Sequence, residues 1–231
     1  HGNLLEDART NCRLVRLDTP MLTREAFEAL ASMDEKGFKG AKIYASYPAG
    51  TENAHALADA VNRLCEQAEE LVRDGVSILA ISDRVGEGEV PMPSLLAVSS
   101  VHNHLLRCGL RTQADLIVEC GDAITAHDFA TLVGYSASGI YPYLVHDTIA
   151  SLAERGVLAI DAETGIANYN TAILSGIVSI MSKMGISTMQ GYHAAQIFEA
   201  VGLASELIDA HFTGTVSRIG GLSIDDLQHE C

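Results

Sequence analysis

An apolar run from Val76 to Ile81, with Ser77 as its single polar residue, most constrains the fold of this chain. It has the length of a strand, and such a run is typical of a strand buried on both faces of a parallel sheet. Similar segments begin near residues 41, 115 and 138, and each is followed by a helical pattern. Four β/α units predict an α/β fold whose parallel sheet is open or curled as part of a barrel.

Three regions are predicted from the pattern along the chain. Residues 1–40 combine an irregular arm with a short helix that Thr23 can cap. Residues 41–160 hold the β/α core, in which the clearest apolar stripe of helical period runs from Asn53 to Asp74. Residues 161–231 are expected to be mostly helical, with helices over 168–181, 192–201 and 205–211, a loop over 212–221 and a last helix capped by Ser223.

The charge and hydropathy exclude several classes of protein. Thirty acidic residues against fifteen Lys and Arg give a net charge of −15, which disfavours binding to a nucleic-acid backbone. We expect no membrane partner either, because no run of eighteen apolar residues occurs. The N-terminus also lacks the basic and apolar pattern of a secretory signal, so a cytoplasmic location is predicted.

Cysteine and histidine spacings predict no metal centre. The five cysteines are widely separated and include no Cys-x-x-Cys pair, so buried reduced thiols are the preferred interpretation. His102 and His104 are close in sequence. Residues two apart on a helix point roughly 200° from each other, so these two side chains cannot share one ion.

Candidate ligand-binding residues follow two of the predicted strands. Ser82, Asp83 and Arg84 end the strand that begins at Val76, and Glu119 ends the next one. Loops at the carboxyl ends of parallel strands commonly hold ligands. In the structural interpretation, Asp83 and Arg84 pair with each other or with loop backbone. In the functional one, the carboxylates of Asp83 and Glu119 form a general acid/base pair.

The turn from Ser182 to Thr188 is the second candidate contact site, because it carries a cation and several hydroxyls between two helical patterns. Lys183 could bind an anion, and Ser187 or Thr188 could cap the next helix. Neither a glycine-rich phosphate loop nor a Gly-x-Ser-x-Gly nucleophile motif is found. The sequence therefore identifies no catalytic, cofactor-binding or metal-binding residues.

Several long motifs resemble the central domain of the glutamate synthase large subunit. They include IMSKMGIST at 180–188, QIFEAVGL at 196–203 and FTGTVSRI at 212–219. ISDR at 81–84 and PSLLAV at 93–98 agree with the same family and stand in the same order. The resemblance therefore extends over nearly the whole chain.

The resemblance implies a connecting role within a larger oxidoreductase of glutamate biosynthesis. In that family a glutaminase domain releases ammonia, which passes through a tunnel to an FMN-binding barrel that converts 2-oxoglutarate to glutamate. The central domain would serve as scaffold and tunnel wall, while FMN and an iron–sulfur cluster belong to other parts of the enzyme. The residues expected to contact those domains, or to lie in contact loops, are Ser82, Asp83, Arg84, Glu119, Lys183, Ser187, Thr188 and Arg218.

The sequence departs from the family pattern at position 193, and two other functions stay open. His193 stands where the family usually has arginine, so an anion or inter-domain contact made by that cation is in doubt. The alternatives are a stand-alone β/α enzyme that uses Asp83, Arg84 and Glu119 on a small anion, and a binding module for an anionic metabolite.

Overall fold

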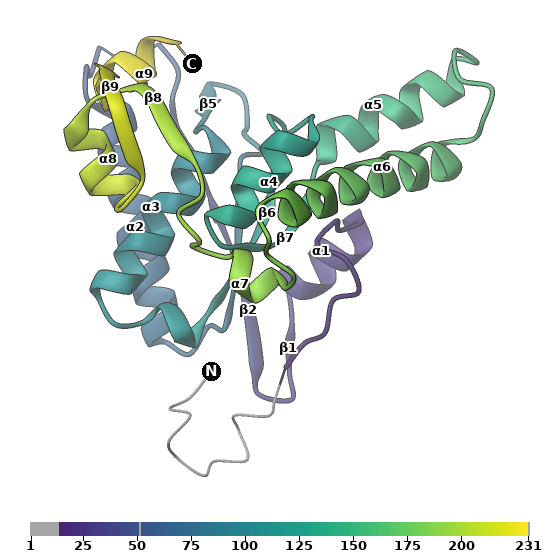
Figure 1. The fold of residues 1–231 in the computed structure, drawn as a ribbon, viewed down its shortest axis with the longest axis horizontal. Coiled ribbons are helices and arrows are strands. Elements are labelled where there is room, and N and C mark those ends of the chain that lie inside the picture. Colours follow the sequence, from purple (N-terminus) through teal and green to yellow (C-terminus); the bar gives the residue numbers. More distant parts are fainter. Residues whose placement is uncertain (1–13, 51, 231) are drawn as a thin grey trace.

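The computed structural model describes residues 14–50 and 52–230. Its centre is a five-stranded sheet, ordered β1-β2-β4-β6-β7, in which β1 alone is antiparallel. Figure 1 shows this sheet within an α/β body. The predicted α/β fold with four parallel strands is confirmed, and the antiparallel strand β1 is an addition to the predicted parallel sheet. The strands are β1 (Asp34–Glu35), β2 (Phe38–Tyr44), β4 (Ile78–Ser82), β6 (Asp115–Glu119) and β7 (Ala137–Tyr141).

Both faces of the sheet are buried, which explains why its strands read as apolar runs. Leu79 and Ile81 of β4 belong to the larger core, formed with α2 (Ala56–Arg73), α3 (Ser94–Arg107) and α4 (Ala126–Gly134). Ile78 and Ala80 face the other way, where Phe27 and Leu30 of α1 (Arg24–Ala31) cover them. The face that would line the inside of a closed barrel is thus filled by α1. As predicted, Thr23 caps this helix by accepting the Ala26 N–H at 3.2 Å.

The helices α5 (Tyr143–Glu154) and α6 (Ala162–Lys183) form an antiparallel hairpin that projects from the body (Figure 1). Helix α6 begins six residues before the predicted start at 168, because Asp161 caps it and accepts the Thr164 N–H at 2.8 Å. No described helix is long and apolar enough to cross a membrane.

The C-terminal portion corrects two predictions. The expected helix over 192–201 is replaced by the end of α7 (Met189–Tyr192) and by strand β8 (Glu199–Leu203). The expected loop over 212–221 is largely strand β9 (Val216–Leu222), which pairs with β8 in parallel. Helices α8 (Ser205–His211) and α9 (Ile224–Glu230) occur as predicted, and Ser223 caps α9 by accepting the Asp226 N–H at 3.2 Å.

The physical reason for the lost helix lies just before β8. Ala194 and Gln196 adopt φ angles of 54° and 53°, which a right-handed helix cannot contain. The Phe198 ring stacks on Tyr135 with 6.1 Å between centroids and fills the space beside Gly134. A Cβ at Gly134 would lie 2.5 Å from that ring. Packing against α4 therefore fixes an extended conformation that the helical pattern of the sequence did not indicate.

Two short strands form a separate two-stranded sheet. Strand β2 ends at Tyr44, and β3 (Ser46–Pro48) follows it. Strand β3 pairs in antiparallel fashion with β5 (Glu89–Pro91). The three-part division at residues 40 and 160 stays a prediction.

Candidate functional site

The side chains of Ser82 and Glu119 meet at the carboxyl ends of the parallel strands. The two residues are register partners in β4 and β6, and the Ser82 hydroxyl donates to the Glu119 carboxylate at 2.6 Å. Arg84 Nε donates to the same carboxylate at 2.8 Å, and Lys42 Nζ lies 3.3 Å from it. Glu119 is only 2% exposed. We call Lys42, Ser82, Asp83, Arg84 and Glu119 the strand-end cluster.

Helices α1 and α5 close over this cluster through ion pairs. Glu28 of α1 pairs with Lys42 at 2.9 Å, and Arg24 of α1 pairs with Asp147 of α5 at 2.9 Å. Asp147 also approaches Arg84 at 3.5 Å. The Arg84 guanidinium lies 4.0 Å from the centre of the Tyr143 ring. The cations of the cluster are therefore held in place by the covering helices.

The Glu119 carboxylate is fixed in its ionised form. Burial by itself would raise the pKa of Glu119, but the hydrogen bonds from Ser82 and Arg84 and the nearby Lys42 ammonium outweigh it and lower the pKa. A carboxylate with three donors around it has little capacity left to take up or release a proton. This geometry favours the structural interpretation of Glu119 over a general acid or base.

Asp83 occupies a different environment from Glu119. Its Oδ2 accepts the Gly121 N–H at 2.8 Å, while Oδ1 has no hydrogen-bond partner among the described residues. Burial, followed by the nearby carboxylates of Asp122 and Glu119, raises the pKa of Asp83 to about 6. No hydrogen bond joins the carboxyl groups of Asp83 and Glu119 in the described structure. The acid/base pair stays without geometric support.

The remaining predicted residues lie in other parts of the fold. Thr188 caps α7 by accepting the Gly191 N–H at 3.1 Å, whereas Ser187 is exposed. Lys183 is exposed in the last turn of α6 and makes no ion pair with the described residues. Arg218 of β9 pairs with Glu199 of β8 at 2.9 Å. The structure therefore gathers Ser82, Asp83, Arg84 and Glu119, but not the other four residues.

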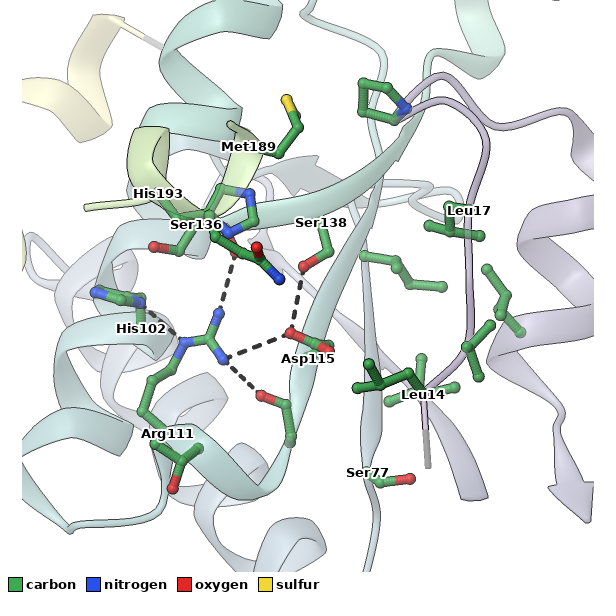
Figure 2. A pocket seen from close by; sticks show the side chains of 18 of the residues that line it. Leu14, Leu17, Ser77, His102, Arg111, Asp115, Ser136, Ser138, Met189 and His193 are labelled. Atoms are coloured by element: carbon green, nitrogen blue, oxygen red, sulfur yellow. Dashed lines mark hydrogen bonds and ion pairs between the residues drawn. The ribbon is translucent and has the colours of Figure 1, made fainter. Parts of the chain in front are cut away.

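A pocket of about 730 Å³ lies at the opposite, amino-terminal ends of the strands. Figure 2 shows Arg111 among its lining side chains, with Asp115 and Ser138 from the starts of β6 and β7. Arg111 Nε donates to His102 Nδ1 at 2.9 Å, and its terminal nitrogens donate to the carbonyl oxygens of Ala114 and Ser136. The nearest carboxylate, that of Asp115, is 4.0 Å away.

Two neutral histidines surround the Arg111 guanidinium. Burial, Arg111 and His193 together lower the pKa of His102 to about 4. Burial and Arg111 also lower the pKa of His193, whose Nε2 has no hydrogen-bond partner among the described residues. A neutral imidazole suits position 193 because a second permanent cation would face Arg111 there. The pocket is thus lined by one guanidinium that forms a long ion pair with Asp115, and Asp18 is a second lining carboxylate.

Sequence reasoning missed both Lys42 and Arg111. Lys42 lies inside a strand, and no pattern indicated that it faces a buried carboxylate two strands away. Arg111 precedes a strand, at the end of the sheet that was not expected to hold ligands. A cation directly before or inside a buried strand is the one signal that could have identified them, because an isolated buried charge requires a partner.

The described cysteines mostly agree with their prediction. Cys65 and Cys120 are buried, and Cys108 is half-buried; all three are free thiols. Cys12 and Cys231 lie outside the described residues. His102 and His104 do not converge, because His102 contacts Arg111 and His104 contacts Glu69.

Known proteins resemble the chain over almost its whole length. It is 42% identical to the glutamate synthase [NADPH] large chain of Bacillus subtilis over 99% of this chain and 15% of that protein. It is 39% identical to glutamate synthase [NADH] of Schizosaccharomyces pombe over 98% of this chain and 11% of that protein. Ferredoxin-dependent glutamate synthase of Spinacia oleracea, named as chloroplastic, is 38% identical over 99% of this chain and 15% of that protein. The chain thus spans about a seventh or less of these relatives.

A more distant likeness is seen in solved structures. The flavin-binding domain of baker's yeast flavocytochrome b2 superposes with a TM-score of 0.43 and 13% identity, over 63% of this chain and 36% of that one. So low a score supports no inference about function. The sequence profile described as "Glutamate synthase central domain" matches residues 1–204. With this match and the identities to full-length enzymes, the chain belongs to the glutamate synthase central domain family.

Proposed function

We propose that this chain is the connecting domain of a longer glutamate synthase, where it holds the glutaminase and FMN-binding domains in register and forms part of the ammonia-tunnel wall. The reaction of that enzyme would convert glutamine and 2-oxoglutarate to glutamate. In this proposal FMN and the iron–sulfur cluster belong to the longer enzyme. A cytoplasmic location stays a prediction, since the spinach relative is named as chloroplastic.

The observation that carries the proposal is the exposure of apolar side chains on the β8–β9 pair and on the α5–α6 hairpin. Val201 of β8 and Ile219 of β9 lie on the same small strand pair, and their exposed fractions are 67% and 60%. Val178 of α6 and Val157 between α5 and α6 are 56% and 62% exposed on the projecting hairpin. Val201 and Ile219 are register partners, and apolar groups that are exposed side by side mark contact surfaces more often than single ones do. Within the strand-end cluster, by contrast, Lys42, Ser82 and Arg84 all bond to the Glu119 carboxylate.

We assign the β8–β9 pair to a contact with the FMN-binding domain. In the family that the chain resembles, the FMN-binding domain follows the central domain along the sequence. The β8–β9 pair is formed by the C-terminal part of this chain. The loop from Ser182 to Thr188 would add Lys183 and Ser187, whose side chains are exposed here, to the same contact. This role requires no catalytic group in the chain itself.

A coupling assay on the longer enzyme tests the proposal. Val201→Ser combined with Ile219→Ser should reduce glutamate formation from glutamine by about tenfold or more, because loosened domains let ammonia escape. Glutamine hydrolysis and glutamate formation from added ammonia should be retained. Leu106→Ser, at an exposed apolar position of α3, is the matched control and should leave coupling unchanged.

Two outcomes would overturn the connecting role. One is a double variant that couples glutamine hydrolysis to glutamate formation as well as the unaltered enzyme does. The other is activity of the chain on its own, seen as glutamine hydrolysis or as a flavin absorbance spectrum of the purified protein.

The Arg111 pocket favours a second function, namely binding of a small anionic metabolite. Arg111 lines the pocket beside two neutral histidines, and its ion pair with Asp115 is long at 4.0 Å. A guanidinium in such a place can bind an anionic group through its terminal nitrogens. Thermal-shift titrations of the chain with 2-oxoglutarate, glutamate and phosphate test this function. Saturable stabilisation that Arg111→Met removes would support it. If none of the three anions shifts the melting temperature, the binding function is wrong.

A further inference from the structure

Glu69, His104 and Cys108 bring three potential metal ligands together between two helices, in a place unrelated to the strand-end cluster or the Arg111 pocket. His104 lies in the last turn of α3, and Cys108, four residues later, is the C-cap residue that follows the helix, so the two side chains lie on the same face. Glu69 faces them from α2. Glu69 Oε2 lies 2.7 Å from His104 Nε2 and 3.2 Å from Cys108 Sγ, and the sulfur is 3.6 Å from the same nitrogen.

The arrangement of Glu69, His104 and Cys108 differs from that of a catalytic triad with a cysteine nucleophile. In a cysteine–histidine–carboxylate triad the imidazole separates the thiol from the carboxylate, one at each ring nitrogen. Here the thiol and the carboxylate both approach Nε2, and they also contact each other. All three potential ligand atoms lie within 4.8 Å of one another. Ligand atoms that converge on one point suit a single ion better than proton transfer.

The separations are close to those around a tetrahedral zinc ion. With Zn–N and Zn–O near 2.0–2.2 Å and Zn–S near 2.3 Å, neighbouring ligand atoms stand about 3.3 to 3.6 Å apart. The Sγ···Nε2 distance of 3.6 Å and the Sγ···Oε2 distance of 3.2 Å nearly match this spacing. On binding, the Glu69–His104 edge has to lengthen by roughly 0.7 Å and the Glu69–Cys108 edge by roughly 0.4 Å. A half-buried site leaves the fourth position to water.

Arg73 orients the Glu69 carboxylate as a metal ligand. Its guanidinium donates to Oε1 of Glu69 at 2.7 and 2.9 Å, which leaves Oε2 turned toward His104 and Cys108. The hydrogen bond from Arg73, followed by those from Cys108 and His104, lowers the pKa of Glu69 to about 2. The hydrogen bond to Glu69 raises the pKa of the Cys108 thiol, so the ion would have to displace that proton. Fixing a ligand through a neighbouring side chain is common in metal sites.

We propose that Glu69, His104 and Cys108 bind a zinc-class divalent cation that links α2 to α3, with water as the fourth ligand. One thiolate, one imidazole and one carboxylate form a ligand set that suits Zn²⁺ and disfavours Mg²⁺ or Ca²⁺. The net charge of −15 also favours the approach of a cation. The sequence did not indicate this site, because two of its ligands are 35 residues or more from Glu69 along the chain.

A cobalt titration of the metal-free full chain tests the site. Co²⁺ bound through Cys108 should produce a thiolate-to-cobalt absorption band in the near ultraviolet that saturates at one equivalent, and added Zn²⁺ should abolish it. Cys108→Ser should remove the band. His104→Ala and Glu69→Gln should each weaken Co²⁺ binding by about tenfold or more.

Matched variants separate the site from other metal-binding groups. Glu70→Gln removes a carboxylate from the next, exposed position of α2, and Cys120→Ala removes a buried thiol next to β6. Both should leave the Co²⁺ titration unchanged. Absence of a thiolate band, or a band that persists in Cys108→Ser, would overturn the proposal. Circular dichroism of each variant shows that the fold is retained.

Discussion

Glu119 shows how a single buried carboxylate organises the residues around it. It accepts from Ser82 and Arg84 and lies beside Lys42, so one acidic group connects strands β2, β4 and β6. The desolvation cost of an ion at this depth is large unless such partners surround it. This residue is therefore better explained by structural requirements than by chemistry on a substrate.

Asp83 provides a prediction for pH dependence at the residue scale. Its pKa is raised from 3.8 to about 6 in the folded chain, so the unfolded chain loses this proton first as pH rises. Stability should therefore fall between about pH 4 and pH 6, and the cost at neutral pH is about 2 to 3 kcal/mol. Asp83→Asn keeps an acceptor for the Gly121 N–H and should gain stability relative to the unaltered chain over this window.

Urea unfolding at pH 4, 5, 6 and 7 measures the difference between the two proteins. The difference is the informative quantity, because His102, with its pKa lowered to about 4, makes stability rise with pH in nearly the same window. Asp209→Asn, at an exposed position of α8, is the matched control. A stability difference that stays constant from pH 4 to pH 7 would show that Asp83 does not titrate as described.

At the scale of elements, α6 combines a buried stripe with an exposed one. Ile173, Ile177 and Met181 recur every four residues and belong to the core. Gly176 allows α6 to approach α4, since a Cβ there would lie 2.5 Å from the Cβ of Ala126. Val178, one residue after Ile177, is exposed. Helix α6 therefore packs against α4 and α5, while the part of its surface that carries Val178 stays exposed.

The neighbouring positions 177 and 178 provide a paired test of this description. Ile177→Ala should lower the free energy of unfolding by about 2 to 4 kcal/mol, because it leaves a cavity at a side chain that is 1% exposed. Val178→Ala should change it by less than about 0.5 kcal/mol, since an exposed site loses little packing. Thermal or urea unfolding of the isolated chain gives both values. Equal costs at the two positions would contradict the assignment of faces.

Strands β8 and β9 with α8 between them form a second, small β/α/β unit. Its strands pair in parallel, and their register is interrupted between Ala200 and Val201 and again between Val201 and Leu203. Gly202 has a φ of 79°, which departs from strand geometry. Irregular strands of this kind give no alternating pattern, and this explains why the sequence was interpreted there as helix and loop.

At the scale of the whole molecule, the parallel strands β2, β4, β6 and β7 stand in the sheet in the order in which they occur in the chain. This is the order of successive units in a β/α barrel, but α1 covers the face that a barrel would enclose. The sheet therefore stays open, with α1 on one face and α2, α3 and α4 on the other. A projecting hairpin and a peripheral strand pair extend from this body (Figure 1), and the proposed connecting role would use them as contact surfaces.

The sequence by itself determined the β/α core, the caps at Thr23 and Ser223, and the family, because apolar period, capping and motifs are properties of neighbouring residues. It left the cap of α7 open between Ser187 and Thr188, and the structure places it at Thr188. Only the tertiary structure decided which distant side chains meet. Glu119 joins Lys42 across 77 positions, and His104 meets Glu69 across 35. Such pairs depend on how strands and helices pack, and packing leaves no local period in the sequence.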